Sequence, residues 1–293
     1  MTTLWDAVVI GGGAAGLFCA GVAGQLGKKV LVVDHAPVLG EKIRISGGGR
    51  CNFTNVHSSP AHFLSLNPHF VKSALARYPS KEFIKLVAAH GIGYHEKHQG
   101  QLFCDDSAKQ IVQMLLSECA KGKVTIRHPV VVQSITQEAD QWVVNIDGGQ
   151  IKTKSVVMAT GGLPVPAIGA SAYSLDIAKQ FGLSVVHPRP ALVPLSFTAE
   201  SFGSLSELAG LSVPVRIFSG IKGQRYGACQ FDEDLLLTHK GLSGPAVLQA
   251  SSYWVEGEAI NIDWLGADNG SKSVDCDELF NREGSRLKNA ETI

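Results

Sequence analysis

Two hydrophobic patterns alternate along residues 1–187 of this 293-residue chain. Short runs of apolar and β-branched residues predict buried strands, and apolar residues spaced three and four apart predict amphipathic helices. The predicted strands lie at residues 7–10, 29–33, 124–126, 130–132, 141–146, 150–153 and 155–158. The predicted helices lie at residues 14–26, 70–78, 80–90, 107–120 and 174–181, with Ser80 as an N-cap. This order of elements is typical of an α/β fold with a parallel sheet.

The pattern changes near His187, where several prolines precede a stretch of short strands. Strands are predicted at residues 192–197, 213–219, 225–231, 235–238 and 259–265, and a helix at 244–252. Beyond Gly266 the chain is polar, and its end is charged and helix-prone. We therefore predict a Rossmann-like domain over residues 1–187, a mostly β insert domain over 188–266, and a polar helical tail over 267–293.

A glycine-rich turn follows the first predicted strand. Gly11, Gly13 and Gly16 fit the pattern G-x-G-x-x-G between a strand and a helix, and Asp34 ends the next strand. In that setting, the N–H groups at the start of the helix favour a pyrophosphate, and the carboxylate holds a ribose hydroxyl. An ordinary glycine-rich turn in a βαβ unit is the alternative. The complete context predicts a dinucleotide-binding site.

A second glycine cluster lies at Gly47, Gly48 and Gly49, within the segment Ser46-Gly-Gly-Gly-Arg-Cys-Asn. Glycine clusters occur where a tight turn or a close approach requires the missing Cβ. The two clusters together predict one elongated ligand, FAD, held at its phosphates and at its reactive end. Because no second G-x-G-x-x-G follows a strand, we expect NAD(P)H to act only as a transient electron donor.

The amino-acid composition limits which partners and which cellular compartment we expect for this protein. The chain has 26 basic and 26 acidic residues, so no global field favours nucleic acid or an anionic membrane. Its six cysteines lack C-x-x-C spacing, which favours reduced thiols in a cytoplasmic protein and no metal site. The uncharged, glycine-rich stretch 7–27 has no basic residue before it, so we interpret it as neither a signal peptide nor a membrane span. We expect a small-molecule substrate, no nucleic acid and no membrane partner, and we predict no oligomeric state.

The complete set of motifs resembles the BaiN-like, or aminoacetone-oxidase-like, family of NAD(P)/FAD-dependent oxidoreductases. The residues that carry this resemblance are 8–16, 42–55, 158–162, 190–194 and 237–247. The SGGGRCN loop combined with the THKGLSGPA segment is far more specific than the nucleotide motif. The resemblance implies a Rossmann-like FAD domain with a β-rich insert and covers the chain to about Gly266.

The resemblance also implies residue roles. Ala15 and Gly16 would approach the pyrophosphate, and Asp34 would hold the adenosine ribose. Lys42 and the second glycine loop would lie along the ribityl chain and the isoalloxazine ring, and the backbone of Val132 would contact adenine. The predicted cofactor-binding residues are Gly11, Gly13, Ala14, Ala15, Gly16, Asp34, Lys42, Gly47, Gly48, Gly49, Arg50, Cys51, Val132, Thr160 and Gly161.

The sequence departs from the family pattern in two places. Residues 170–174 replace a Gly-Asp-Gly-type turn that often follows Gly169. The family chain also returns to the first domain with a glycine-rich segment that closes over the flavin, and this sequence has no such segment. We therefore expect a C-terminally truncated chain with an incomplete FAD site.

Three residues are candidates for catalysis. Arg50 would stabilise the reduced, anionic flavin ring, or it would form a salt bridge that fixes its loop. Cys51 would form a thiol–flavin pair, although no resolving cysteine lies close in sequence. His239 would donate a proton to the substrate, but we favour a structural role, because Ser243-Gly244-Pro245 fits an N-cap followed by a helix start. Asn52 and Asn55 would contact the ring edge or stabilise turns.

The predicted function is that of an FAD-dependent oxidoreductase acting on a small organic molecule. Reduction of an activated C=C bond and oxidation of an amine or alcohol both remain open. The alternative is a truncated, non-catalytic remnant that binds adenine nucleotide weakly or acts only through protein contacts. A flavin-dependent RNA-modifying enzyme is disfavoured, because the charge is neutral and the sequence has no basic stripe.

Overall fold

The computed structural model describes residues 4–198, 202–220 and 227–264. The chain divides into two compact units, one of residues Met1–His62 and Val71–Val186, the other of Phe63–Phe70 and His187–Ile293. The predicted division into three parts stays a prediction, because the tail 267–293 lies outside the described residues. No helix in the described ranges is long and apolar enough to cross a bilayer.

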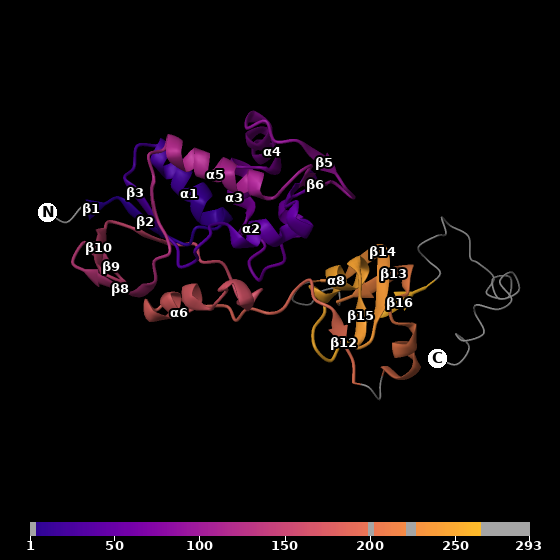
Figure 1. The fold of residues 1–293 in the computed structure, drawn as a ribbon. Helices are drawn as coiled ribbons and strands as arrows, with labels where there is room; N and C mark the ends of the chain where they lie inside the picture. The colour runs from indigo at the N-terminus through magenta and orange to yellow at the C-terminus, as the bar shows by residue number, and fades with distance from the viewer. Residues whose placement is uncertain (1–3, 199–201, 221–226, 265–293) are drawn as a thin grey trace, which may run out of the picture. The chain divides into compact units, whose positions relative to one another are not determined.

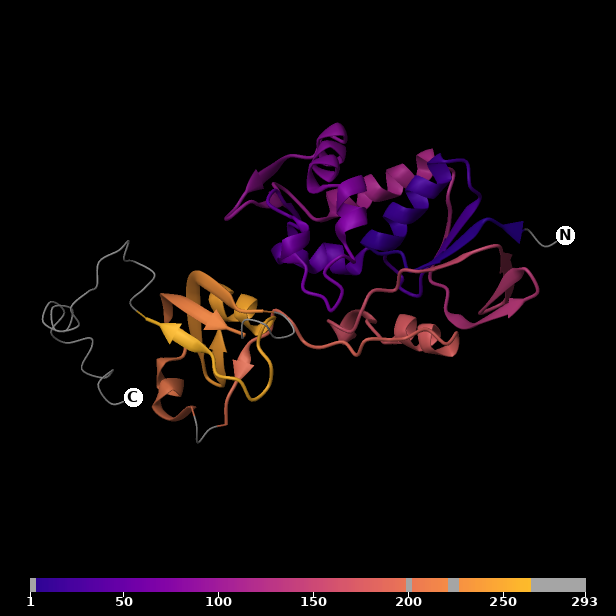
Figure 2. The same ribbon diagram turned by 180° about the vertical axis from the view of Figure 1, so that it is seen from behind.

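A parallel sheet of four strands organises the first unit (Figures 1 and 2). Its strands, in spatial order, are β11 (Val156–Met158), β2 (Ala7–Ile10), β3 (Val30–Val33) and β7 (Thr125–Arg127). All three pairings are parallel. The order of strands reverses beside β2, which is the topological switch point of a Rossmann-like fold. The predicted α/β, Rossmann-like fold is therefore confirmed.

Alternate residues of the two central strands enter two different cores. Val9, Val30 and Val32 belong to one core, and Val8, Ile10, Leu31 and Val33 to the other. Successive side chains of a strand point to opposite faces, so both faces of this sheet are buried. Burial on both faces explains why the two strands have continuous apolar sequences.

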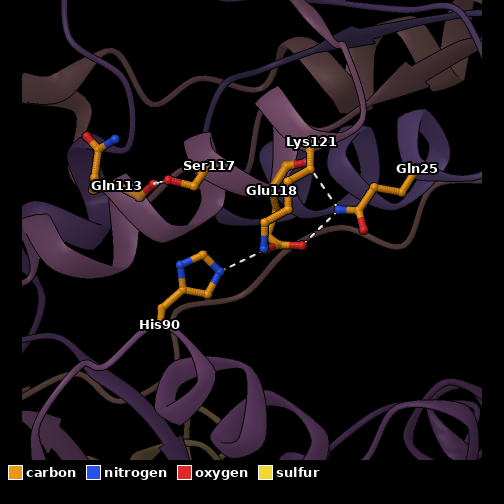
Figure 3. A network of polar contacts seen from close by, with 6 residues as sticks. All are labelled: Gln25, His90, Gln113, Ser117, Glu118 and Lys121. Carbon is orange, nitrogen blue, oxygen red and sulfur yellow. Dashed lines mark hydrogen bonds and ion pairs between the residues drawn. The ribbon is translucent and has the colours of Figure 1, made fainter.

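Two helices cover one face of the sheet. They are α1 (Ala14–Gln25) and α5 (Lys109–Lys121), which lie side by side in Figure 1. At the end of α1, Gln25 Nε2 donates to Glu118 Oε2 at 2.8 Å (Figure 3). Lys121 Nζ lies 2.6 Å and His90 Nε2 2.7 Å from Glu118 Oε1. Glu118 thus ties α1, α5 and the residue that follows α4 (Ser80–Ala89) together.

The other face is covered by a second sheet and a helix. The sheet has the order β1 (Leu4–Trp5), β10 (Gly149–Thr153), β9 (Gln141–Ile146) and β8 (Val132–Glu138). Helix α6 (Tyr173–Gln180) contributes Ile177 to the same core. The predicted hairpin between residues 141–146 and 150–153 is confirmed, with Asp147 and Gly148 as its turn.

Residues between β3 and α5 form a third substructure. It contains an antiparallel sheet in the order β4 (Asn52–Asn55), β6 (Gln101–Cys104) and β5 (Tyr94–Glu96). The short elements around it are α2 (Glu41–Ile45), η1 (Ser46–Gly49), η2 (Pro60–His62) and α3 (Lys72–Arg77), together with α4. None of these three strands is predicted from the sequence, because the segments NFTN, YHE and QLFC lack the β-branched apolar runs of β2 and β3.

The second unit is mostly β. Its antiparallel sheet has the order β12 (Leu195–Ser196), β15 (Gly241–Ser243), β14 (Cys229–Thr238), β13 (Ser212–Ser219) and β16 (Asn261–Asp263). Helix α8 (Pro245–Ser251) packs on β13 and β14. A 3-10 helix, η4 (Gly203–Leu208), precedes β13, and the first unit has another, η3 (Pro166–Ile168).

Several predicted element boundaries were wrong. Residues 229–231 and 235–238 of two predicted strands belong to the single strand β14, because Asp232, Glu233 and Asp234 all pair with β13. Residues 225 and 226 of the first prediction lie outside the described residues. Helix α4 has Pro79 as its N-cap, and the Ser80 side chain makes no cap hydrogen bond. Helix α8 is capped by Gly244, and Ser243 belongs to β15.

Candidate cofactor site

The first glycine cluster forms the turn between β2 and α1. Gly11 N donates to Val33 O at 2.8 Å, and Ala159 N donates to Ile10 O at 2.8 Å. The φ of Gly11 is +113°, and a Cβ there would collide with the carbonyl of Ala159. The turn therefore lies where β2, β3 and β11 end, which is where open α/β sheets bind ligands.

The glycines of this turn are required for different physical reasons. A Cβ on Gly12 would collide with the Leu39 side chain, and a Cβ on Gly16 with the carbonyl of Gly11. No atom lies within 4 Å of a Cβ on Gly13. Gly13 is also the N-cap of α1, which has no side-chain cap hydrogen bond. The first N–H groups of α1 are therefore available to an anion.

Asp34 follows the last residue of β3, and its carboxylate is largely buried. Gly12 N donates to Oδ2 at 2.5 Å, and Ala36 N donates to Oδ1 at 2.7 Å. His35 Nδ1 lies 3.7 Å from Oδ1. Each carboxylate oxygen has a further lone pair, so Asp34 is held in place and can still accept a hydroxyl group.

A cavity of about 700 Å³ opens beside this turn, a volume in the range of cofactor sites. The predicted cofactor-binding residues that line it are Gly11, Gly13, Ala14, Ala15, Asp34, Lys42, Val132, Thr160 and Gly161. Lys42 Nζ also donates to Gly162 O at 3.1 Å. Gly16 does not line the cavity, because its position allows α1 to pack against Gly11.

Several residues of this cavity are not predicted from the sequence. Met158, Ser171, Tyr173 and Ser174 line it. Ser174 Oγ hydrogen-bonds to Thr160 Oγ1. The Tyr173 hydroxyl is buried, its pKa is raised by burial, and it has no hydrogen-bond partner among the described residues. One feature of the sequence points to these residues: a helix, α6, follows the parallel strand β11. The first residues of such a helix can lie at the edge of the sheet where a cofactor binds.

These features fit the adenosine and pyrophosphate part of a dinucleotide. The space beside Gly13 would admit a phosphate, and the first turn of α1 supplies N–H donors. The fixed Asp34 carboxylate suits a ribose hydroxyl, and the unpartnered Tyr173 hydroxyl suits a further polar group.

The second glycine cluster does not line this cavity. Gly47, Gly48 and Gly49 all have left-handed backbone, with φ of +57°, +66° and +85°. A Cβ on Gly47 would lie 2.7 Å from Phe103 Cε1, whereas Gly48 faces open space. Ala108 N donates to Gly49 O at 2.7 Å, which fixes the loop. The contact of this loop with a flavin ring stays a prediction.

Arg50 and Cys51 follow this loop in different environments. Arg50 is exposed, and among the described residues its guanidinium has no ion-pair partner. Cys51 is buried, and burial raises the pKa of its thiol. Cys104, whose N–H donates to Arg50 O at 2.9 Å, has a pKa of about 11, raised by burial and by Cys51. A second cysteine is thus near Cys51, but both thiols are protonated at neutral pH, which disfavours thiol–flavin chemistry.

His239 lies in the second unit, in the exposed turn between β14 and β15. Thr238 Oγ1 donates to Gly241 O at 2.8 Å and closes this turn. A Cβ on Gly241 would collide with Leu195 O, and one on Gly244 would lie 2.6 Å from Asp234 O. These contacts explain the THKGLSGPA segment as hairpin and sheet packing. The capping role expected of Ser243 was wrong.

Asn55 makes two hydrogen bonds that stabilise turns, and its contact with the ring edge stays a prediction. Its Nδ2 donates to Gln99 O at 2.9 Å, and its Oδ1 accepts from His57 N at 2.8 Å. No group of three or more His, Cys, Asp or Glu side chains in the described part of the chain is arranged to hold a metal ion.

The chain matches one protein family and is similar to several known proteins. The family described as HI0933-like protein Rossmann domain matches residues 5–279. A protein named ribosomal RNA dihydrouridine synthase, from Escherichia coli strain K12, is 49% identical over 279 residues, which cover 95% of this chain and 67% of that protein. A 3-dehydro-bile acid delta(4,6)-reductase from Clostridium scindens is 26% identical over 85% of this chain and 60% of that protein. The crystal structure of L-proline dehydrogenase from P. horikoshii is similar with a TM-score of 0.44 and 13% identity, over 83% of this chain and 69% of that one.

Proposed function

Because the chain belongs to the HI0933-like protein Rossmann domain family, we propose that it is an FAD-dependent oxidoreductase that reduces uridine in ribosomal RNA to dihydrouridine. The observation that carries the substrate is the 49% identity, over 95% of this chain, to the Escherichia coli ribosomal RNA dihydrouridine synthase. The observation that supports FAD is the cavity at the ends of β2, β3 and β11, with its free helix N-terminus and its fixed carboxylate.

The proposed reaction is a two-electron reduction. Uridine has a C5=C6 double bond conjugated to a carbonyl, and dihydrouridine forms when two electrons and two protons are added across it. When bound, FAD would supply those two electrons. We propose NAD(P)H as the donor that restores them.

The chain's own residues would bind and orient the cofactor. The N–H groups at the start of α1 would hold the pyrophosphate, Asp34 would accept a ribose hydroxyl, and Lys42 would neutralise negative charge beside it. Apolar side chains such as Ile10, Val33 and Met158 line the same cavity and would exclude water. We keep Arg50 as the candidate cation beside the reactive ring.

The neutral charge of the chain argued against RNA as a substrate. Net charge, however, sets only the long-range field, and it averages over regions of opposite sign. Identity over nearly the whole chain constrains the site more directly than this average does, so we give it the greater weight.

A small-molecule substrate is the second candidate, and one observation favours it. The Clostridium scindens relative is named a reductase of a bile-acid double bond. This candidate is the BaiN-like activity that the sequence motifs resemble. Both candidates favour C=C reduction over amine or alcohol oxidation, because both named relatives saturate a double bond.

The test begins with the purified chain. FAD is titrated by fluorescence quenching, and released flavin is identified after denaturation. The loaded protein is then incubated with NADH or NADPH and either unmodified ribosomal RNA or a conjugated steroid ketone. Dihydrouridine is measured by mass spectrometry of digested nucleosides, and the saturated ketone by chromatography.

Each result decides between the candidates. Formation of dihydrouridine supports the proposal. Saturation of the ketone without formation of dihydrouridine would favour the small-molecule substrate instead. Flavin binding without turnover of either substrate would favour the non-catalytic remnant. Absence of flavin binding would overturn the flavoenzyme proposal for this chain.

A further inference from the structure

Charge is unevenly distributed in the first unit. Residues 42–62 and 71–98 carry eight of the chain's 26 basic residues but only two of its 26 acidic residues. The eight basic residues are Lys42, Arg44, Arg50, Lys72, Arg77, Lys81, Lys85 and Lys97. A chain of zero net charge therefore contains a segment with six more basic than acidic residues, bounded by Glu41 before it and by Asp105 and Asp106 after it.

Five of the eight basic residues, Lys72, Arg77, Lys81, Lys85 and Lys97, lie in one substructure, whereas Lys42 and Arg44 belong to α2 and Arg50 follows the second glycine loop. The substructure comprises the β4–β6–β5 sheet with α3 and α4, and it lies at the end of the first unit opposite β1 in both views (Figures 1 and 2). A chain of aromatic contacts joins its elements to one another and to α1. Phe53 contacts both Tyr94 and Phe83, and Phe18 contacts both Phe83 and Tyr78, with ring centroids 5.0–6.3 Å apart.

The β5–β6 hairpin presents basic and aromatic groups to solvent. All three residues of β5, an edge strand, are exposed. Lys97 Nζ lies 5.3 Å from the centroid of the Phe103 ring, and the His95 ring stacks on Phe103 at 6.4 Å. Gly100 lies in the hairpin turn, and the His57 ring occupies the position that a Cβ on Gly100 would take.

The acidic groups beside this hairpin are already engaged. Glu96 Oε1 accepts the N–H of Gly100 at 2.8 Å, and Asp105 Oδ1 lies 2.7 Å from His95 Nδ1. The hairpin is also continuous with the second glycine loop, since Gly47 packs against the Phe103 ring. A ligand held on the hairpin would thus lie next to the loop expected at the reactive end of the flavin.

We propose that this substructure is the surface that binds the RNA substrate, an inference that rests on the proposed function. Lysine and arginine side chains on β5–β6, α3 and α4 would contact phosphates, and exposed rings such as Tyr94 and His95 would stack on unpaired bases. Contacts of these two kinds are typical of single-stranded RNA sites. The occupant is a phosphodiester chain with unpaired bases, and not merely a polyanion.

Charge-removing variants of the FAD-loaded chain test this surface. Binding of a short fluorescein-labelled oligouridine is followed by anisotropy at several salt concentrations. Lys97→Gln should weaken binding about threefold and lower the salt slope by about 0.7, the contribution of one phosphate contact on a single strand. Arg77→Gln/Lys81→Gln/Lys97→Gln should weaken binding about tenfold or more and lower the slope by about 2.

Lys28→Gln is the matched control. Lys28 is an exposed lysine between α1 and β3, outside the basic substructure, so its loss should leave binding and slope unchanged. Flavin affinity and the midpoint of thermal unfolding should be the same in all variants, which separates loss of contact from loss of fold.

The outcomes distinguish this inference from the proposed function. If the wild-type chain binds oligouridine and the Lys97 and triple variants bind it equally well, RNA does not bind at this surface, and the proposed function stands. If the wild-type chain forms no dihydrouridine in ribosomal RNA, the proposed function itself fails. Stronger binding to heparin or to phosphatidylglycerol vesicles than to oligouridine would assign the surface to another anionic partner.

Discussion

The two glycine clusters of the first unit look alike in sequence and differ in structure. In the turn 11–16, Gly11, Gly12 and Gly16 lie where a Cβ would collide with neighbouring atoms, and only Gly13 has open space. In the loop 47–49, the backbone is left-handed throughout, and Gly48 meets no neighbour. The first cluster is required by close packing around a cavity, and the second mainly by backbone conformation. Glycine content alone therefore does not identify a ligand contact.

The largest effect is expected at Gly16. In Gly16→Ala the new methyl group would collide with the backbone carbonyl of Gly11, which no side-chain movement can relieve. We expect a loss of about 3 kcal/mol or more in the free energy of unfolding. Urea unfolding, with Gly13→Ala as the matched control in the same turn, measures it. Equal stability of the two variants would contradict the packing role.

The second cluster should be most sensitive at Gly47. Gly47→Ala combines a left-handed φ with a contact of 2.7 Å to Phe103, whereas Gly48→Ala has only the left-handed φ. We expect Gly48→Ala to cost about 1–2 kcal/mol and Gly47→Ala to cost more. Thermal unfolding compares them, and Gly48→Asn should recover part of the loss. A loss of flavin affinity in Gly48→Ala without a loss of stability would make this loop a ligand contact after all.

Gly13→Ala should affect the cofactor and not the fold. The backbone at Gly13 has φ −86° and ψ −168°, which alanine adopts without strain, and no atom lies near the new methyl group. We expect the free energy of unfolding to change by less than about 0.5 kcal/mol. The dissociation constant of FAD should rise about tenfold, because the methyl group would occupy space beside the phosphate. Unchanged affinity would show that the pyrophosphate does not pass Gly13.

The smallest effect on the cofactor is expected at the opposite end of α1. Lys121, with help from Gln25 and His90, holds the pKa of Glu118 at about 2, below its ordinary 4.5. Because the folded-state pKa is the lower one, the stabilisation is complete above pH 4.5 and is lost as pH falls toward 2. Glu118→Gln should therefore lower stability at neutral pH and flatten its decline between these values.

Unfolding followed over this pH range measures the effect of Glu118→Gln, and FAD affinity at neutral pH is the control. The two ends of α1 are about 17 Å apart, so the affinity should not change. A large loss of affinity would show that the cofactor end depends on this network.

Much of the fold of the first unit could be predicted, because its signals are local. The apolar runs of β2 and β3, the glycine turn and Asp34 follow one another within residues 7–34, and each has a backbone reason that sequence shows. Nine of the fifteen predicted cofactor-binding residues line the cavity, and these lie at the ends of such elements. Strands such as β4 (NFTN) and β5 (YHE) lack the apolar, β-branched runs that identify β2 and β3, so no local pattern predicts them.

What the sequence by itself determined is the order of those strands and helices that have an apolar run or a helical period, and the need for glycine at the first turn, because periodicity and backbone sterics are properties of neighbouring residues. The tertiary structure decided which distant residues meet. It brought Tyr173 and Ser174 to the cavity, placed Cys104 beside Cys51, and joined two predicted strands into β14 by pairing with β13. It also gathered basic residues from three elements into one substructure. These outcomes depend on contacts between residues far apart in the chain, which no local pattern encodes.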